Sequence, residues 1–179
     1  MSDWTSTSMP YLAPPVEGAP SDVWGAEASA QGRRGTQRIA QAGEVPAPPA
    51  VAALLGMEPG RPVVVRRRII ELDDTPCELT DTYYPADIAR GTRLTGTGKI
   101  RGGAVALLAE LGHVGVRVQE DVTAHMPDAE ERAELHLAEN EPVLHIARLT
   151  LDADGRPIQA DLITMPARRQ RLRYEIRIG

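Results

Sequence analysis

The stretch PVVVRRRIIELDDTPCELTDTYYP, residues 62–85, contains two runs typical of β-strands on either side of a turn. The turn falls at Asp73-Asp74-Thr75-Pro76, where aspartate and proline either tolerate or preset the backbone angles that a tight turn requires. The second run, Cys77–Tyr84, follows the turn directly. The stretch therefore predicts a β-hairpin.

A similar hairpin is predicted 80 residues further along the chain. Pro142-Val143-Leu144 corresponds to Pro62-Val63-Val64, and Arg148-Leu149 corresponds to Arg68-Ile69. A second turn, rich in Asp and Gly, then leads into another β-forming run, Ile158–Met165. The repeat indicates that one structural unit is used twice.

Each hairpin is preceded by a short predicted helix, and each helix by a predicted strand. The prolines at 46–49 suit a first helical turn, and Asp128 can cap the second helix. The unit is therefore β-α-β-β, and the fold class is α+β: a largely antiparallel sheet of about six strands with three short helices. The predicted helices are Ala50–Leu55, Gly103–Leu111 and Pro127–Glu131, and the further strands are Thr36–Val45, Val116–Ala124 and an alternating last strand, Leu172–Ile178.

Composition excludes several classes of protein. The chain has 179 residues, a net charge of −5 and 42% hydrophobic residues, which suits one globular domain and argues against a generic nucleic-acid binder. A single cysteine, Cys77, excludes an internal disulfide framework and a Cys-based zinc cluster. No apolar run approaches the length of a membrane span, and the N-terminus lacks the features of a signal peptide. These observations predict a cytoplasmic protein.

The N-terminal residues differ in composition from the rest of the chain. Residues 1–28 contain four prolines and no basic residue, and we expect an extended or disordered tail there, with Trp4, Tyr11 and Trp24 as candidate docking points. Residues 29–179 would form the folded domain. The tail has neither the amphipathic helices nor the basic side chains that a winged helix needs.

Several motifs, taken in order, resemble one known family. The stretch Pro76–Pro85 resembles the "PVxLxxSYxP" strand of UTRA domains, the effector-binding domains of GntR-type transcriptional regulators of the HutC subfamily. Residues 102–113 resemble the central helix of that domain, and residues 120–131 its next strand and helix. Glu141-Pro-Val143-Leu and Asp154-Gly-Arg-Pro157-Ile resemble its closing hairpin.

The resemblance implies a chorismate-lyase-like fold, a cytoplasmic homodimer and a pocket for a small-molecule effector. The winged helix that accompanies the family's domain is expected to be missing from this chain, so we expect a sensor that does not bind specific DNA alone. It would act in regulation of transcription through ligand binding and dimerisation. Two alternatives remain open: a chorismate-lyase-like enzyme, and a subunit that pairs with a full-length GntR regulator with its own winged helix.

The resemblance also places an effector pocket, but this chain retains little of its polar set. In UTRA domains that sense phosphorylated amino sugars, the corresponding polar positions are here Arg68, Ile70, Thr80, Gln159 and, at the central helix, Gly103-Ala-Val105; the aromatic position is Met165. Only Arg68 is unchanged. A phosphate needs several converging donors, so the expected effector is apolar or carries a carboxylate, and a sugar phosphate is not expected.

Strand parity gives the same face without reference to the family. Glu120 would lie on an apolar face and need a partner, either Arg68 or Arg148, because unpaired burial of a charge is costly. A plain structural ion pair is the alternative interpretation. The full candidate set for effector binding is Arg66, Arg68, Ile70, Thr80, Thr82, Gly103, Val105, Glu120, Arg148, Gln159, Asp161 and Met165.

Other chemistry has weaker support. His113, His125, His136 and His145 show no ligand spacing typical of a metal site, and we expect neither metal nor cofactor. Asp81 and Glu120 are a candidate acid–base pair, but nothing marks a nucleophile or oxyanion site, so no catalytic residue is assigned. The five arginines between 168 and 177 are interpreted as a solvated strand face, with a phosphate-binding patch as the alternative.

Overall fold

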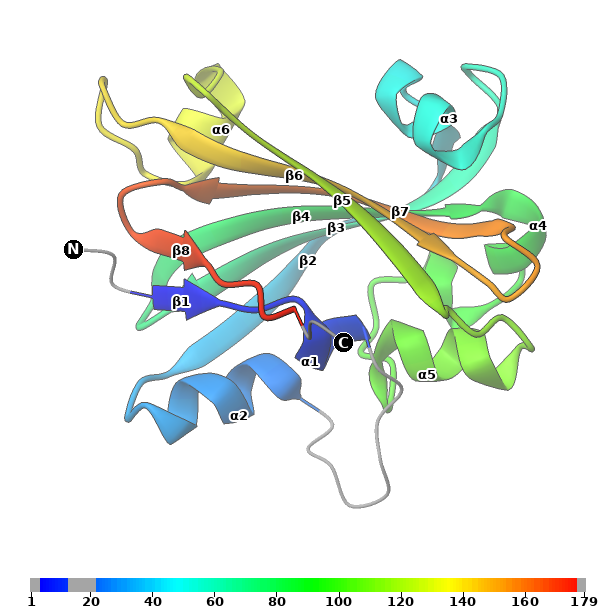
Figure 1. Ribbon diagram of the computed structural model, residues 1–179, viewed down its shortest axis with the longest axis horizontal. Helices are drawn as coiled ribbons and strands as arrows, with labels where there is room; N and C mark the ends of the chain where they lie inside the picture. The colour runs from blue at the N-terminus through cyan, green and yellow to red at the C-terminus, as the bar shows by residue number, and fades with distance from the viewer. Residues whose placement is uncertain (1–3, 13–21, 177–179) are drawn as a thin grey trace.

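A six-stranded antiparallel sheet forms the centre of the protein (Figure 1). The computed structural model describes residues 4–12 and 22–176. The strands follow the order β2-β3-β4-β7-β6-β5 across the sheet. Their bounds are Gly35–Pro46 (β2), Pro62–Leu72 (β3), Thr75–Pro85 (β4), Arg117–His125 (β5), Val143–Leu151 (β6) and Pro157–Pro166 (β7).

The sheet consists of two β-α-β-β units, as the sequence repeat predicted. β2, α3, β3 and β4 form the first unit, and β5, α6, β6 and β7 form the second. Each unit is a meander that runs inward from an edge, and β4 pairs with β7 at the centre. The two halves are therefore arranged about an approximate twofold, which brings equivalent residues of β3 and β6 to the same face.

All three predicted helices are present, and two of them begin at the start signals that the sequence carries. Helix α3 (Pro49–Leu55) begins with proline and ends at Gly56, whose φ of 64° is a left-handed conformation that favours glycine. Helix α6 (Ala129–Glu134) carries a capping box in which Asp128 and Glu131 bond each other's backbone amides. Helix α5 spans Gly103–Glu110.

The hairpin between β3 and β4 turns at two aspartates. Leu72 pairs with Thr75, so Asp73 and Asp74 form a two-residue loop, with φ angles of 50° and 62°. Positive φ at both positions gives the turn the twist that matches its flanking strands, and aspartate tolerates that conformation better than most residues. The predicted turn is thus present but shorter than predicted, because Thr75 and Pro76 already belong to β4.

For the described residues, the structure corrects the prediction of an extended or disordered tail and the prediction of three helices, whereas residues 1–3 and 13–21 of the predicted tail lie outside the described residues. The described parts of residues 1–28 are not extended throughout: they include strand β1 (Trp4–Ser6), helix α1 (Met9–Leu12) and the start of helix α2 (Val23–Ala30). Asp22 caps α2 by accepting a bond from the Gly25 amide, a start signal that the proline content of the region obscured. Helix α4 (Ala86–Ala89) and a 3₁₀ turn (Arg93–Thr95) also add to the three predicted helices.

The last strand is shorter than the alternation of the sequence predicted. Strand β8 spans only Gln170–Leu172, and it pairs in parallel with β1 to form a separate two-stranded sheet. Residues 173–176 are irregular: the Arg173 amide donates to the carbonyl of Ser6, the last residue of β1, and the pairing of the two strands ends there. The rest of the predicted strand, 177–179, lies outside the described residues.

The two faces of the sheet are covered differently (Figure 1). Helices α3 and α6 lie on one face, where Val51 and Leu55 of α3 pack against β3, β4 and β7. On the other face, α4 and α5 pack on one end of the sheet around Tyr84 and Leu94. The remainder of that second face lies beneath β1, β8, α1 and α2, and the space left there is the cavity described next.

Candidate functional site

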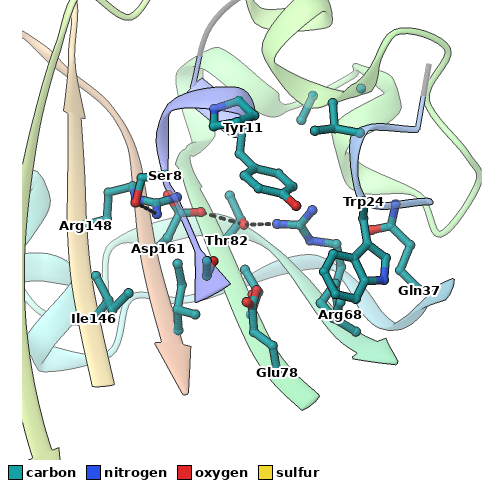
Figure 2. Close-up of a pocket in the computed structure, with 18 of the residues that line it drawn as sticks. Ser8, Tyr11, Trp24, Gln37, Arg68, Glu78, Thr82, Ile146, Arg148 and Asp161 are labelled. Atoms are coloured by element: carbon teal, nitrogen blue, oxygen red, sulfur yellow. Dashed lines mark hydrogen bonds between the residues drawn. The ribbon is translucent and has the colours of Figure 1, made fainter. Parts of the chain in front are cut away.

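A cavity of about 540 Å³ lies between the second face of the sheet and the N-terminal segments (Figure 2). Its floor is formed by β3, β4, β6 and β7, one end by the start of α5, and its cover by β1, α1, α2 and β8. Cavities of this size hold small organic ligands. The cavity is therefore the candidate binding site.

Ten of the twelve candidate residues line this cavity. They come from four strands and one helix, and alternation along each strand directs them to the same face, as parity predicted. Arg66 and Glu120 do not line it. The ten are Arg68, Ile70, Thr80, Thr82, Gly103, Val105, Arg148, Gln159, Asp161 and Met165.

A polar chain crosses the floor of the cavity from Arg68 to Gln159. Arg68 donates from Nη2 to the Thr82 hydroxyl at 3.2 Å, and that hydroxyl donates to Asp161 Oδ1 at 2.7 Å (Figure 2). The Gln159 amide donates to both oxygens of Asp161, at 3.1 and 2.8 Å. Asp161 is 2% exposed, so these donors offset the cost of burying its carboxylate. No carboxylate of the described residues forms an ion pair with Arg68.

Glu78 is a second carboxylate on the cavity wall, and the sequence analysis missed it. It has the same parity on β4 as Thr80 and Thr82, so the alternation already carried the signal. Thr80 donates a short hydrogen bond to its Oε1. Burial raises the pKa of Glu78 above its usual range, against the opposing effects of that hydrogen bond and of Arg68.

Glu120 and Arg148 form the ion pair that the sequence predicted as one of two options. Arg148 donates from Nε to Glu120 Oε1 at 2.6 Å, and Ser8 of the N-terminal segment bonds both residues. Both side chains are 11% exposed. Burial alone would raise the pKa of Glu120, but attraction by Arg148 and the hydrogen bonds hold it below the usual range. Arg148 reaches the cavity wall already neutralised by Glu120.

Arg66 has a structural role instead of a place in this cavity. Its guanidinium donates to backbone carbonyls of the loop that follows α4, including those of Arg93 and Gly98 at 3.3 and 3.2 Å. It also contacts the Gly96 carbonyl. It lines a neighbouring space of about 430 Å³, which shares Arg68 and Thr82 with the main cavity. Arg66 therefore fixes the loop that leads into α5.

The N-terminal segment supplies lining residues that the sequence analysis placed in a tail. The Trp4 and Trp24 rings meet edge to face, with centroids 5.0 Å apart, and both side chains are buried. Tyr11 donates to Glu27 and points toward the cavity (Figure 2). Burial raises the pKa of Tyr11 above its usual range. The three aromatic residues that the sequence marked as docking points all contribute to the cavity cover.

Among residues 4–12 and 22–176, the candidate residues for an acid–base pair and for a metal site do not come together. Asp81 lies on the opposite face of β4 from Thr82 and pairs with Arg67 at 2.8 Å, so Asp81 and Glu120 do not form an acid–base pair. His125 and His145 contact each other with ring centroids 5.8 Å apart, but no group of three potential metal ligands occurs in these ranges. Arg169 of the basic run is engaged by Glu141 at 3.2 Å. None of the helices in these ranges has the length and apolar character needed to span a membrane.

Comparison with known proteins shows that the sequence of this chain is similar to those of transcriptional regulators. The UTRA domain family matches residues 30–171. An uncharacterized HTH-type transcriptional regulator of Streptomyces coelicolor is 30% identical over 135 residues, covering 74% of this chain and 50% of the regulator. A second, from Rhizobium meliloti, is 30% identical over 142 residues, covering 79% and 57%. The chain thus spans little more than half the length of the curated relatives it matches.

Solved structures agree on the fold. The crystal structure of PhnF from Mycobacterium smegmatis superposes with a TM-score of 0.75 at 22% identity, covering 87% of this chain and 68% of that one. The effector domain of PhnF alone gives a TM-score of 0.73 at 22% identity, with 92% and 98% of the two chains covered. At this identity the likeness concerns the fold.

Proposed function

Because the chain belongs to the UTRA domain family, we propose that it is the small-molecule-binding regulatory domain of a GntR/HutC-type system and that its effector occupies the cavity of about 540 Å³. The observation that carries the proposal is the network of Arg68, Thr82 and Asp161 on the cavity floor. It places polar groups that fix orientation beside apolar lining residues such as Ile70, Ile146 and Met165, a combination that small-molecule sites commonly have. Binding, not catalysis, is the activity proposed.

The effector is proposed to carry a carboxylate or to be largely apolar. Arg68 is the cation on the cavity wall that no described carboxylate neutralises, and Arg148 is already paired with Glu120. A phosphate dianion would need more donors than Arg68 and the amides near Gly103 offer. Ile70, Ile146, Ile163 and Met165 supply an apolar floor around that single charge.

We further propose that the protein acts in the cytoplasm as a homodimer and transmits ligand binding to a DNA-bound partner. Strands β2 and β5 are the edges of the sheet, and edges with unpaired backbone groups are usually covered. Two exposed apolar residues lie at one such edge: Val122 in β5 and Val116, which directly precedes it. A winged-helix GntR regulator is the proposed heterologous partner, and this chain alone is not expected to bind specific DNA.

A thermal-shift screen of metabolites against the intact chain tests the proposal. A ligand that binds only the folded state stabilises it by about 2.7 kcal/mol at a hundredfold excess over its dissociation constant. Hits are then measured by calorimetry against Arg68→Ala and against Arg61→Ala, an exposed arginine outside the cavity. A ligand that binds Arg68→Ala as tightly as Arg61→Ala would bind outside the cavity, and this result would contradict the proposal.

A further inference from the structure

Acidic side chains outnumber free cations on the cavity wall. The described lining residues include the carboxylates of Asp22, Glu78 and Asp161 and the guanidiniums of Arg68 and Arg148. Arg148 is neutralised by Glu120, which lies outside the cavity lining. A ligand with only negative charge would therefore enter a cavity whose described lining has three carboxylates and one guanidinium without an acidic partner.

Asp161 and Glu78 differ in how many hydrogen bonds their carboxylates accept from the described residues. Asp161 accepts three hydrogen bonds, from Thr82 and twice from Gln159, so most of its acceptor capacity is used. Glu78 accepts one side-chain bond among the described residues, from Thr80 to Oε1. None of the described residues donates a hydrogen bond to its Oε2, and Glu78 lines the cavity. Glu78 is thus the carboxylate left for a ligand.

Arg68 and Glu78 face different parts of the cavity. The Arg68 guanidinium donates to Thr82, four residues beyond Glu78 on β4. Arg68 itself is paired in register with Thr80, and Ile70 with Glu78. The α-carbons of Arg68 and Glu78 are therefore roughly 8 Å apart, and the hydrogen bond to Thr82 directs the guanidinium away from Glu78. The floor between them carries Thr80 and is flanked by the apolar side chains of Ile163 and Met165. A cation held by Glu78 and an anion held by Arg68 would therefore be joined by an apolar stretch.

We propose that the effector carries a protonated amine that binds the Glu78 carboxylate, in addition to the anionic group that binds Arg68. The ligand class is a zwitterion whose charges are separated by an apolar chain. The inference rests on the proposed function, because it assigns chemistry to the same cavity. It adds a second anchor, and it separates this class from plain carboxylates and from α-amino acids, in which the two charged groups are attached to the same carbon atom.

Four six-carbon probes test the inference by calorimetry and thermal shift on the intact 179-residue chain. They are 6-aminohexanoate, hexanoate, hexylamine and norleucine, which differ in the presence or spacing of the two charges. We expect 6-aminohexanoate to bind at least tenfold more tightly than each of the other three. We also expect Glu78→Gln to bind 6-aminohexanoate about tenfold or more weakly while binding hexanoate at least as tightly as the unmodified chain does, with Glu58→Gln, an exposed control, unchanged for both.

The outcomes separate the two proposals. If hexanoate binds as tightly as 6-aminohexanoate, or if Glu78→Gln leaves 6-aminohexanoate unchanged, the amine anchor is wrong and the effector-binding function stands. The amine anchor is equally wrong if none of the four probes binds but carboxylates or sugar phosphates of the wider screen do. If no compound of that screen binds, both the amine anchor and the effector-binding function are overturned. The comparison of probes on the unmodified chain needs no variant to fold.

Discussion

Arg68 and Arg148 occupy equivalent positions in the two halves of the sheet, but they face different cross-strand neighbours. Arg68 on β3 is paired in register with Ile39 on β2, whereas Arg148 on β6 is paired with Glu120 on β5. The second guanidinium is therefore neutralised by its own unit, and the first is not. The first unit has the apolar Ile39 where the second unit has Glu120. Of the two arginines, only Arg68 therefore remains available as a cation in the cavity.

Replacement of Arg68 by alanine is expected to weaken a carboxylate ligand about ten- to a hundredfold without unfolding the protein. A charge-assisted hydrogen bond in a poorly solvated site contributes roughly 1.5–3 kcal/mol. Calorimetry with 6-aminohexanoate or hexanoate measures the change, with Arg61→Ala as the matched control. Glucosamine 6-phosphate should bind poorly to the unmodified chain. Tight binding of that sugar phosphate, or unchanged affinity in Arg68→Ala, would contradict the assignment.

Replacement of Glu120 by glutamine is expected to destabilise the protein by about 3 kcal/mol at pH 7, because it leaves the largely buried Arg148 without a counter-charge. The pKa of Glu120 is lowered in the folded state, so its stabilising effect is present above the unfolded pKa and is lost as pH falls through the folded value. The difference between variant and wild type should therefore shrink in acid. Urea titrations at pH 7 and pH 3 measure it, and a constant difference would show that the ion pair does not cause it.

Replacement of Glu78 by glutamine is expected to stabilise the unliganded protein at pH 8. Burial raises the pKa of Glu78, so its ionisation opposes folding: the stability present below the unfolded pKa is lost as pH rises through the folded value. The thermal midpoint of Glu78→Gln should exceed that of wild type by a few degrees at pH 8 and match it near pH 4. A lower midpoint of Glu78→Gln at pH 8 would mean that groups of the protein already stabilise the charged Glu78 carboxylate when no ligand is bound.

Light scattering at micromolar concentration is expected to give about twice the chain mass of 19.4 kDa. The reason is that β2 and β5 leave both edges of the sheet available for pairing. Val122→Lys places a charge on the exposed face of β5. The mass of this variant should be compared with the mass of the exposed control Glu58→Lys. A mass of 19.4 kDa for the unmodified chain would contradict dimerisation.

Filter binding at low and moderate salt is expected to show no sequence-specific DNA affinity for the purified chain. The net charge is −5, and Arg169 in the C-terminal basic run is engaged by Glu141. Salt-sensitive binding that disappears in Arg171→Ala and Arg173→Ala would instead establish that run as a phosphate-binding patch. Nanomolar specific binding at physiological salt would overturn the expectation entirely.

Much of the sheet could be predicted because its signals are local and occur twice. The turn at Asp73-Asp74, the cap at Asp128 and the proline at the start of α3 each act within a few residues, and the 80-residue repeat supports each assignment with a second copy. Alternation then placed the side chains of β3, β4 and β7 on the correct face. The same alternation would have included Glu78, which the family resemblance did not single out.

The cover of the cavity could not be predicted, because it depends on contacts between distant parts of the chain. The edge-to-face contact of Trp4 with Trp24, and the bonds from Ser8 to Glu120 and Arg148, have no local sequence pattern. Alternation after Leu172 suggested a longer strand, but strand length is set by the partner, and β1 ends at Ser6. Long-range pairing of this kind needs a structure to reveal it.

The parallel pairing of β1 with β8 has a consequence for the order in which the protein folds. Trp4 pairs with Gln170, so this contact closes a loop that contains nearly the entire chain, whereas each hairpin of the main sheet closes only a short one. Contacts of such large sequence separation form late, because the chain must lose loop entropy before they stabilise it. The sheet can therefore assemble before the cavity has its cover. Among the hydrogen-bonded amides of the strands, exchange should then be fastest at Trp4 and Arg173, which join the two short strands, and slowest at the β4–β7 pair. Ligand entry would then need only a local opening of the part of the protein that folds last.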